Sequence, residues 1–85
     1  MILHKEVGSM QGDFKDYYKM LGLKVAYYRK LRGLTQEALA EMMGVDTSFI
    51  GQIEAPNICK AISLDTLFRI SAALDTPPYK FLHFD

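Results

Sequence analysis

Residues 36–55 read QEALAEMMGVDTSFIGQIEA, and this stretch decides the fold. It predicts two short helices separated by a tight turn at Gly44, because glycine accepts the left-handed backbone conformation on which helices often end. Thr35 can cap the first helix, and Asp46 can cap the second, which is predicted over Thr47–Ala55. Helices joined by so short a turn cross steeply, and apolar residues at fixed offsets fill the crossing. The pattern predicts a packed helix pair that presents the start of its second helix outward.

The segment before this pair predicts a longer amphipathic helix. Apolar residues recur three or four positions apart, Asp13 can cap the start, and Gly33 ends the pattern. This periodicity is typical of a helix that buries one face in a core. The apolar positions are Phe14, Tyr17, Tyr18, Leu21, Val25, Tyr28 and Leu31.

The segment after the pair also predicts helices. Ser63 can cap a fourth helix, and Thr76–Pro78 can start a last helical turn or two. Residues 1–12 show no helical period and are interpreted as an N-terminal arm, which could hold a short strand at residues 2–7. The fold class is therefore all-α, a compact bundle of about five helices in one domain over residues 13–85.

The composition limits what a chain of 85 residues can do. Hydrophobic residues make up 49% and charged residues 24%, as in ordinary globular domains, and so short a domain has no room for a deep catalytic cavity. The single cysteine, Cys59, excludes an internal disulfide and a cysteine-pair metal site, and no motif brings it together with His4 or His83. No apolar run approaches the length of a membrane span. We therefore predict a cytoplasmic protein that is not an enzyme and uses no cofactor and no metal.

The charge of the chain is uneven along its length. Ten basic and ten acidic residues give a formal net charge of zero, which by itself argues against a nucleic-acid partner. Residues 15–33 nevertheless contain six basic residues and one acidic residue, whereas residues 34–59 contain four acidic residues and no basic one. A basic first helix thus precedes an acidic-to-neutral helix pair.

Turn, core and cap positions spread over the chain share their residue types with a known family. They are Arg29, Gly33–Glu37, Leu39–Ala40, Gly44–Val45, Phe49–Ile50, Gln52–Glu54, Ser63–Leu67 and Ala73–Leu74. With these positions, residues 20–84 resemble the phage-repressor and Cro family, also called the xenobiotic-response-element (XRE) family of helix-turn-helix domains. A match over such a length is far more specific than a bare twenty-residue motif. It implies a lambda-repressor-like DNA-binding domain whose second short helix enters the major groove.

The resemblance also implies a role for individual residues of the helix pair. Gln36, the first residue of its helix, and Thr35 are expected to contact a DNA phosphate. Arg29 is expected to form a structural ion pair with Glu54 near the end of the second helix. The residues expected to contact bases, at the exposed start of that helix and one turn along it, are Thr47, Ser48, Gly51 and Gln52.

The helix predicted to read bases contains no Arg or Lys. This helix therefore cannot recognise guanine through an arginine side chain, whereas Gln52 can form two hydrogen bonds with adenine. Few phosphate-binding cations per copy imply modest affinity, which favours a homodimer on paired half-sites. The apolar ends at residues 1–3 and 81–84 are candidates for the dimer interface. The remaining candidates for phosphate contacts are Lys30, Arg32, Asn57 and Lys60.

Each of these residues also has a plain structural interpretation. Gln36 and Gln52 could be solvated helix residues, and Thr47 and Ser48 are common in the first turn of any helix. Gly51 stands where the family commonly has Ser. It either lets the helix backbone approach DNA closely or simply costs about 1 kcal/mol of helix stability.

The sequence therefore predicts a sequence-specific transcriptional regulator, a repressor that binds double-stranded DNA as a homodimer. The alternative is a protein-interaction module on the same fold, such as an antitoxin or a helix-turn-helix domain that has lost DNA binding. This alternative, in which the partner is a protein, remains open because the second helix of the pair contains no Arg or Lys.

Overall fold

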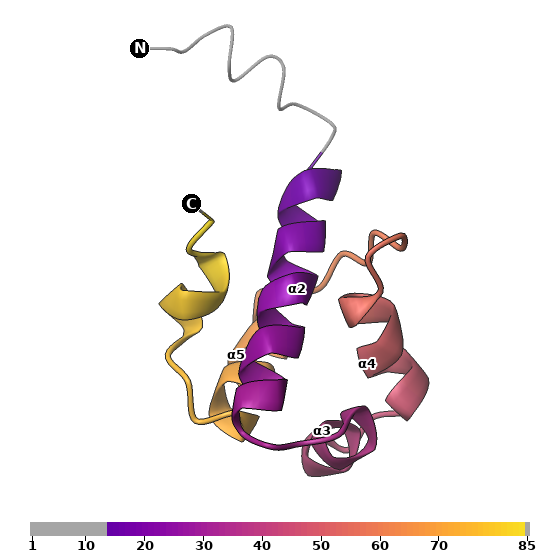
Figure 1. The fold of residues 1–85 in the computed structure, drawn as a ribbon, viewed down its shortest axis with the longest axis vertical. Coiled ribbons are helices and arrows are strands. Elements are labelled where there is room, and N and C mark those ends of the chain that lie inside the picture. The colour runs from indigo at the N-terminus through magenta and orange to yellow at the C-terminus, as the bar shows by residue number, and fades with distance from the viewer. Residues whose placement is uncertain (1–13, 85) are drawn as a thin grey trace, which may run out of the picture.

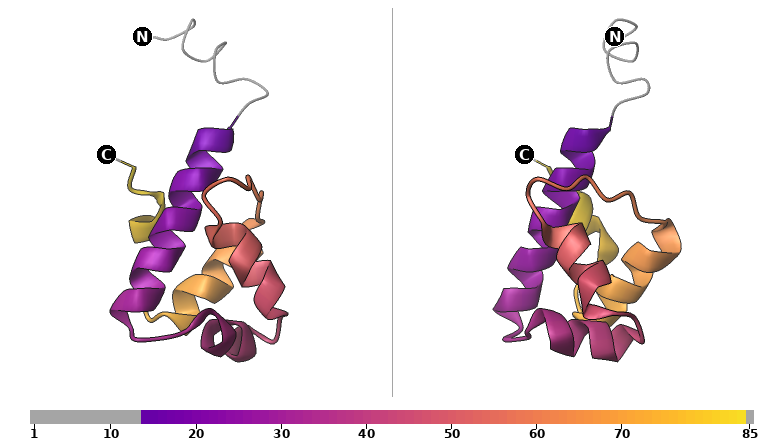
Figure 2. Two further views of the ribbon diagram at one scale, coloured as in Figure 1. Left: turned by 45° about the vertical axis from the view of Figure 1, so that its right-hand side comes forward. Right: turned by 90° about the vertical axis from the view of Figure 1, so that its right-hand side faces the viewer.

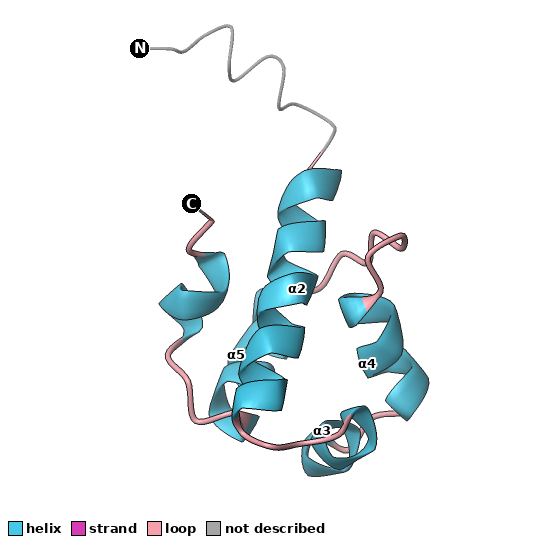
Figure 3. Ribbon diagram, in the orientation of Figure 1, coloured by secondary structure: helices cyan, strands magenta, loops and turns pink. Residues whose placement is uncertain are grey.

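The structure is a computed structural model that describes residues 14–84. Within that range it consists of helices and loops (Figure 3), so the all-α fold class is as predicted. The described part has four α-helices and one short 3₁₀ helix, a small difference from the predicted bundle of about five helices. The predicted arm, its strand and the predicted cap at Asp13 lie outside the described residues. The elements are α2 (Lys15–Leu31), α3 (Gln36–Met43), α4 (Thr47–Glu54), α5 (Leu64–Ala73) and the 3₁₀ helix η1 (Pro78–Leu82).

The helices surround one core (Figure 1). α2 runs along the length of the molecule, α3 crosses below its C-terminal end, and α4 and η1 lie on opposite sides of α2. A view turned by 90° places α4 and α5 above α3, with the loop from α4 to α5 passing over them (Figure 2). The largest fully buried side chains are those of Val25, Leu39, Ile50, Ile70, Leu74 and Phe81.

Local interactions explain where α3 and α4 begin and end. Thr35 Oγ1 accepts a hydrogen bond from the backbone N–H three residues on, at 3.0 Å, so α3 begins at the predicted cap. It ends at Gly44, whose φ of 70° is a left-handed conformation that favours glycine. α4 begins after Asp46 as predicted, although this carboxylate makes no capping hydrogen bond. α4 ends at Glu54, one residue earlier than predicted, because a residue before proline, here Ala55, is disfavoured in the helical conformation.

The buried face of α2 is rotated relative to the predicted apolar stripe. Leu21 and Val25 are buried as predicted, but three other members of the stripe are exposed. The buried face includes Gly22 and Arg29 instead, and α4 packs against α2. Apolar periodicity alone could not reveal this rotation, because neither a glycine nor an arginine counts as apolar. The exposed members of the predicted stripe are Phe14, Tyr17 and Leu31.

The C-terminal segment completes the core. Phe81, predicted to be part of an exposed apolar tip, is completely buried, and its ring packs edge-to-face against Tyr28 with centroids 5.2 Å apart. The expectation that residues 81–84 form an exposed interface is therefore wrong for Phe81. Leu64 and Phe68, two apolar residues of α5, are both exposed, so the side of α5 that faces the core is narrower than its apolar content suggests.

Candidate nucleic-acid interface

One face of α4 carries the four residues predicted to contact bases. Thr47, Ser48 and Gln52 are exposed and Gly51 is half-buried. Their spacing of one, four and five residues places them on one side of a helix, while Ile50 and other apolar residues face the core. The structure therefore brings these four residues together on a surface whose side chains are all uncharged.

The start of α3 lies beside this face. The Oε1 atom of Gln36 is 3.6 Å from the position that a Cβ atom on Gly51 would occupy, so the glutamine side chain lies against α4. Thr35 is exposed, and its hydroxyl oxygen accepts the capping hydrogen bond while its hydroxyl hydrogen remains free to donate. The two predicted phosphate contacts of α3 thus adjoin the predicted base contacts of α4.

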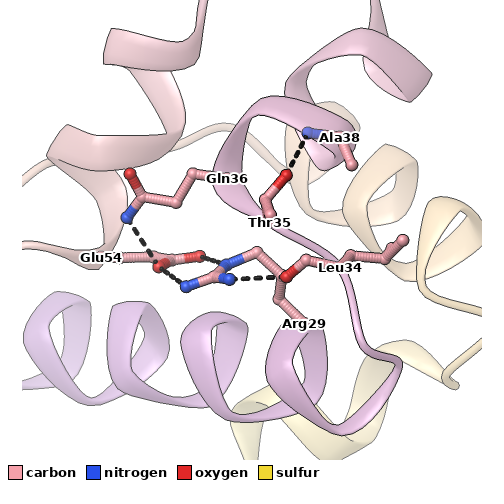
Figure 4. Close-up of polar contacts among 6 residues, drawn as sticks. All are labelled: Arg29, Leu34, Thr35, Gln36, Ala38 and Glu54. Carbon is pink, nitrogen blue, oxygen red and sulfur yellow. Dashed lines mark hydrogen bonds and ion pairs between the residues drawn. The ribbon is translucent and has the colours of Figure 1, made fainter.

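A buried ion pair joins α2 to α4 (Figure 4). Arg29 Nε donates to Glu54 Oε2 and Arg29 Nη2 donates to Glu54 Oε1, each at 2.8 Å. Both residues are 7% exposed. Hydrogen bonding to Glu54 raises the pKa of Arg29 above its ordinary value, in opposition to burial, which lowers it. The structure thus brings together the two residues that the sequence pattern pairs, in the two-pronged geometry that arginine makes with a carboxylate.

The same ion pair reaches the start of α3. Arg29 Nη1 donates to the carbonyl oxygen of Leu34 at 2.7 Å, which fixes the turn between α2 and α3. Gln36 Nε2 donates to Glu54 Oε1 at 3.0 Å, as Figure 4 shows. One guanidinium and one carboxylate therefore connect α2, the turn, α3 and α4. Among the described residues, every buried side-chain nitrogen and oxygen has a hydrogen-bond partner.

The hydrogen bond between Gln36 and Glu54 was not anticipated from the sequence. The two residues are 18 positions apart, so no local spacing rule relates them. Lys60 gives a second such case: its Nζ lies 5.6 Å from the centroid of the Phe49 ring, which holds this cation close to α4. Both contacts depend on how the helices pack.

The other predicted phosphate contacts differ in their surroundings. Lys30 is exposed on the last turn of α2, and Asn57 is exposed in the turn that follows α4. The guanidinium of Arg32 donates to the carbonyl oxygens of Leu74 and Asp75, both at 2.7 Å, at the C-terminal end of α5. In this structure Arg32 therefore holds α5 in place through carbonyl groups that would otherwise lack a helical partner.

A shallow groove with a volume of about 580 Å³ lies between the starts of α3 and α4. Three carboxylates line it, and all three are exposed. Thr47, at the start of the predicted base-reading face, lines the same groove. Negative charge beside this face opposes the approach of phosphates, and the opposition weakens as salt screens it. The three carboxylates are those of Glu37, Glu41 and Asp46.

Other kinds of site find no support in the part of the chain that the structure describes. Residues 14–84 contain no group of three or more His, Cys, Asp or Glu side chains placed to hold a metal ion. Over the same range, no helix has the length and apolar character needed to cross a membrane. Cys59 is exposed, and its Sγ lies 3.7 Å from the carbonyl oxygen of Lys15.

The known proteins to which this chain is similar are transcriptional regulators and controller proteins. Control protein C.SmaI from Serratia marcescens is 35% identical over 69 residues, which are 81% of this chain and 80% of that protein. The HTH-type transcriptional regulator YazB from Bacillus subtilis, itself uncharacterised, is 33% identical over 63 residues, 69% of this chain and 91% of that protein. The structure of the restriction-modification controller protein C.AhdI from Aeromonas hydrophila superimposes with a TM-score of 0.69 at 30% identity, covering 75% of this chain and 94% of that one.

The family model for the helix-turn-helix family HTH_3 matches residues 25–81. This range contains all the residues predicted to contact DNA and both members of the ion pair, and it includes α3, the turn at Gly44 and α4. The match covers well over half of the sequence and agrees with the fold, the caps and the buried ion pair. The chain therefore belongs to the helix-turn-helix family HTH_3.

Proposed function

We propose that this DNA-binding transcriptional regulator is a sequence-specific repressor that acts as a homodimer, with α4 in the major groove of double-stranded DNA. The observation that carries the proposal is the exposed, uncharged face of α4 directly beside the start of α3. In helix-turn-helix domains the second helix of the pair reads bases while the first crosses the phosphate backbone. The protein acts in the cytoplasm by occupying a promoter, and no chemical step is involved.

Base reading depends on four neutral residues. The amide of Gln52 can donate to and accept from the N7 and N6 edge of adenine, and Thr47 and Ser48 can hydrogen-bond bases or touch a thymine methyl group. Gly51 lets the helix backbone come close to the DNA. Because α4 offers no arginine, its preferred operator contains A·T pairs at the contacted positions.

Phosphate binding depends mainly on the start of α3. The first backbone N–H groups of α3 have no helical partner, and Thr35 Oγ1 occupies only the one at Ala38. The side chains of Gln36 and Thr35 add further donors. Lys60, held near α4 by Phe49, and exposed Asn57 extend this surface. Lys30 adds long-range attraction from α2. Arg32 stays outside the proposed set because its guanidinium is engaged at α5.

The proposal of a homodimer is based on the small number of basic side chains near α4. Each phosphate contact contributes to affinity through counterion release, and few contacts per copy make a single copy a weak binder. Two copies on half-sites about 34–36 Å apart, one turn of the double helix, would combine two weak contacts into one stable complex.

A second candidate function is a protein-interaction module. The carboxylates of the groove between α3 and α4, together with the absence of cations from α4, favour it, because such a surface suits a basic protein segment as well. Under this alternative, DNA binding would be absent and a protein would occupy the same face.

The deciding experiment is selection from a randomised DNA pool, followed by titration of the enriched sequence at about 50 and 200 mM salt. We expect an enriched site with two symmetry-related halves, A·T pairs at the contacted positions and affinity that falls with salt. Sedimentation of the complex should give two protein copies per duplex. A pool without enrichment, combined with binding that does not depend on salt, would reject the regulator and leave the interaction module.

A further inference from the structure

The side-chain amide of Gln36 is held in one orientation. Its nitrogen faces Glu54 and donates to Oε1 at 3.0 Å, and its oxygen points away from Glu54 toward α4, as Figure 4 shows. The nitrogen of an amide carries two hydrogens, so one N–H of Gln36 remains available to another acceptor. That hydrogen is the donor a DNA phosphate requires.

Glu54 determines this orientation because both oxygens of its carboxylate accept hydrogen bonds. If the amide turned over, its oxygen would face a carboxylate oxygen, and two acceptors cannot share a hydrogen bond. Arg29 donates to both oxygens of this carboxylate and so holds it in place. The partner of Gln36 is therefore a buried, fixed acceptor, with Glu54 only 7% exposed.

The backbone that carries Gln36 is fixed by the same charged group. Arg29 Nη1 holds the carbonyl oxygen of Leu34, two residues before Gln36. The guanidinium thus fixes the start of α3 directly and the glutamine amide through Glu54. A side chain ordered before binding avoids the entropic cost of being ordered on DNA, a cost that corresponds to roughly three- to tenfold in affinity.

We infer that Glu54 is a positioning residue for Gln36, and that it orders the amide which donates to phosphate. The inference rests on the proposed phosphate contact of Gln36 and adds to it a second residue, one that never touches DNA. Glu54 belongs to α4 but is buried, unlike the exposed residues of the base-reading surface, so the ion pair serves DNA binding as well as the fold.

The test is a double-mutant cycle on affinity for the selected DNA site. Glu54→Gln, Gln36→Ala and the double variant are compared with the unmodified protein by fluorescence anisotropy. We expect Glu54→Gln to weaken binding roughly three- to tenfold when Gln36 is present and less than about twofold when residue 36 is alanine. Equal factors in both backgrounds would show that Glu54 does not act through Gln36 and would overturn the inference.

The chain offers a matched control in Gln52, an exposed glutamine on the opposite side of α4 from the ion pair. In a Gln52→Ala background, Glu54→Gln should still weaken binding by its full factor, because Gln36 is intact. A loss of that factor in the Gln52→Ala background would instead show that Glu54→Gln acts by distorting the base-reading face, and it would also overturn the inference. If Gln36→Ala alone leaves affinity unchanged, the proposed phosphate contact itself fails, which is a separate outcome.

Two further measurements guard against loss of the fold. Where thermal unfolding shows that Glu54→Gln does not fold, the cycle is run with Arg29→Met and Glu54→Met together, since an apolar pair can replace a buried ion pair. In either variant, the side-chain amide protons of Gln36, observed by NMR in the free protein, should move to the positions of a solvated glutamine. Unchanged amide signals would contradict the positioning role whatever the affinities are.

Discussion

The carbonyl oxygen of Ile53 in α4 occupies the space in which a side chain on Gly22 of α2 would lie. A Cβ atom built on Gly22 would overlap this oxygen and would lie 3.1 Å from the carbonyl carbon of Ile53. The two helices thus approach backbone to backbone, which only glycine permits. One residue further along α4, Glu54 meets Arg29, so the close approach and the ion pair occur in the same crossing of α2 and α4.

Gly22→Ala is expected to destabilise the protein by about 3 kcal/mol, because the added methyl group meets backbone atoms that cannot rotate away. Urea unfolding followed by circular dichroism measures this change. The same substitution at Gly51, in a helix position with room, is the matched control. A Gly22→Ala variant as stable as the unmodified protein would show that α2 and α4 do not meet in this way.

Gly51→Ala is expected to increase the free energy of unfolding by about 0.5–1 kcal/mol and to weaken DNA binding at the same time. Alanine favours the helix, and its Cβ would make only an ordinary contact, 3.6 Å from Gln36 Oε1. On DNA the same methyl group would stand between α4 and the duplex. Unfolding and anisotropy measurements on one preparation separate the effects, and unchanged affinity would mean that Gly51 does not serve close approach.

Arg29→Met is expected to cost about 3–5 kcal/mol of stability, because the carboxylate of Glu54 stays buried without its partner. Arg29→Met combined with Glu54→Met should recover most of that loss. Because the pKa of Arg29 is raised in the folded protein, the stabilisation by this guanidinium is complete at any pH below the ordinary arginine pKa. It is lost only when the pH rises through the pKa of the folded state. The free energy of unfolding should therefore not change through this group between about pH 6 and 10. Thermal unfolding across that range provides the measurement.

Gln52→Ala is expected to relax the preference at one base pair by about 1–3 kcal/mol and to leave the other positions of the operator unchanged. Gln36→Ala should instead weaken all sequences alike and reduce the dependence of affinity on salt. Repeating the pool selection with each variant distinguishes the two roles. If Gln52→Ala enriches the same site with the same base frequencies, Gln52 does not read a base.

Asp46→Asn is expected to tighten DNA binding by about two- to fivefold at low salt, with a smaller gain at high salt, because a negative charge beside the start of α4 is removed. Asparagine caps helices as well as aspartate, and the carboxylate of Asp46 makes no capping hydrogen bond, so stability should change little. Asp16→Asn, in the first turn of α2 and at the far end of that helix from α3 in Figure 1, controls for net charge. Equal gains from both variants would reject a local effect.

The sequence by itself determined the helix pair, because the signals for it act over a few residues. Thr35 caps α3 through a side chain three residues from its partner, and Gly44 ends α3 through its own backbone conformation. Family resemblance added the pairing of Arg29 with Glu54. The same resemblance gave the positions of α4 that are expected to contact bases, and the periodicity of a helix places them on one side.

Only the tertiary structure decided the contacts that join segments distant in the sequence. The hydrogen bond from Gln36 to Glu54 and the engagement of Arg32 at the end of α5 depend on where whole helices lie. The burial of Phe81 similarly depends on the return of η1 to α2. The local sequence pattern determines which helix carries a side chain. The partner that the side chain contacts depends on how closely the backbones of two helices approach. In this protein that distance depends on a missing side chain, at Gly22.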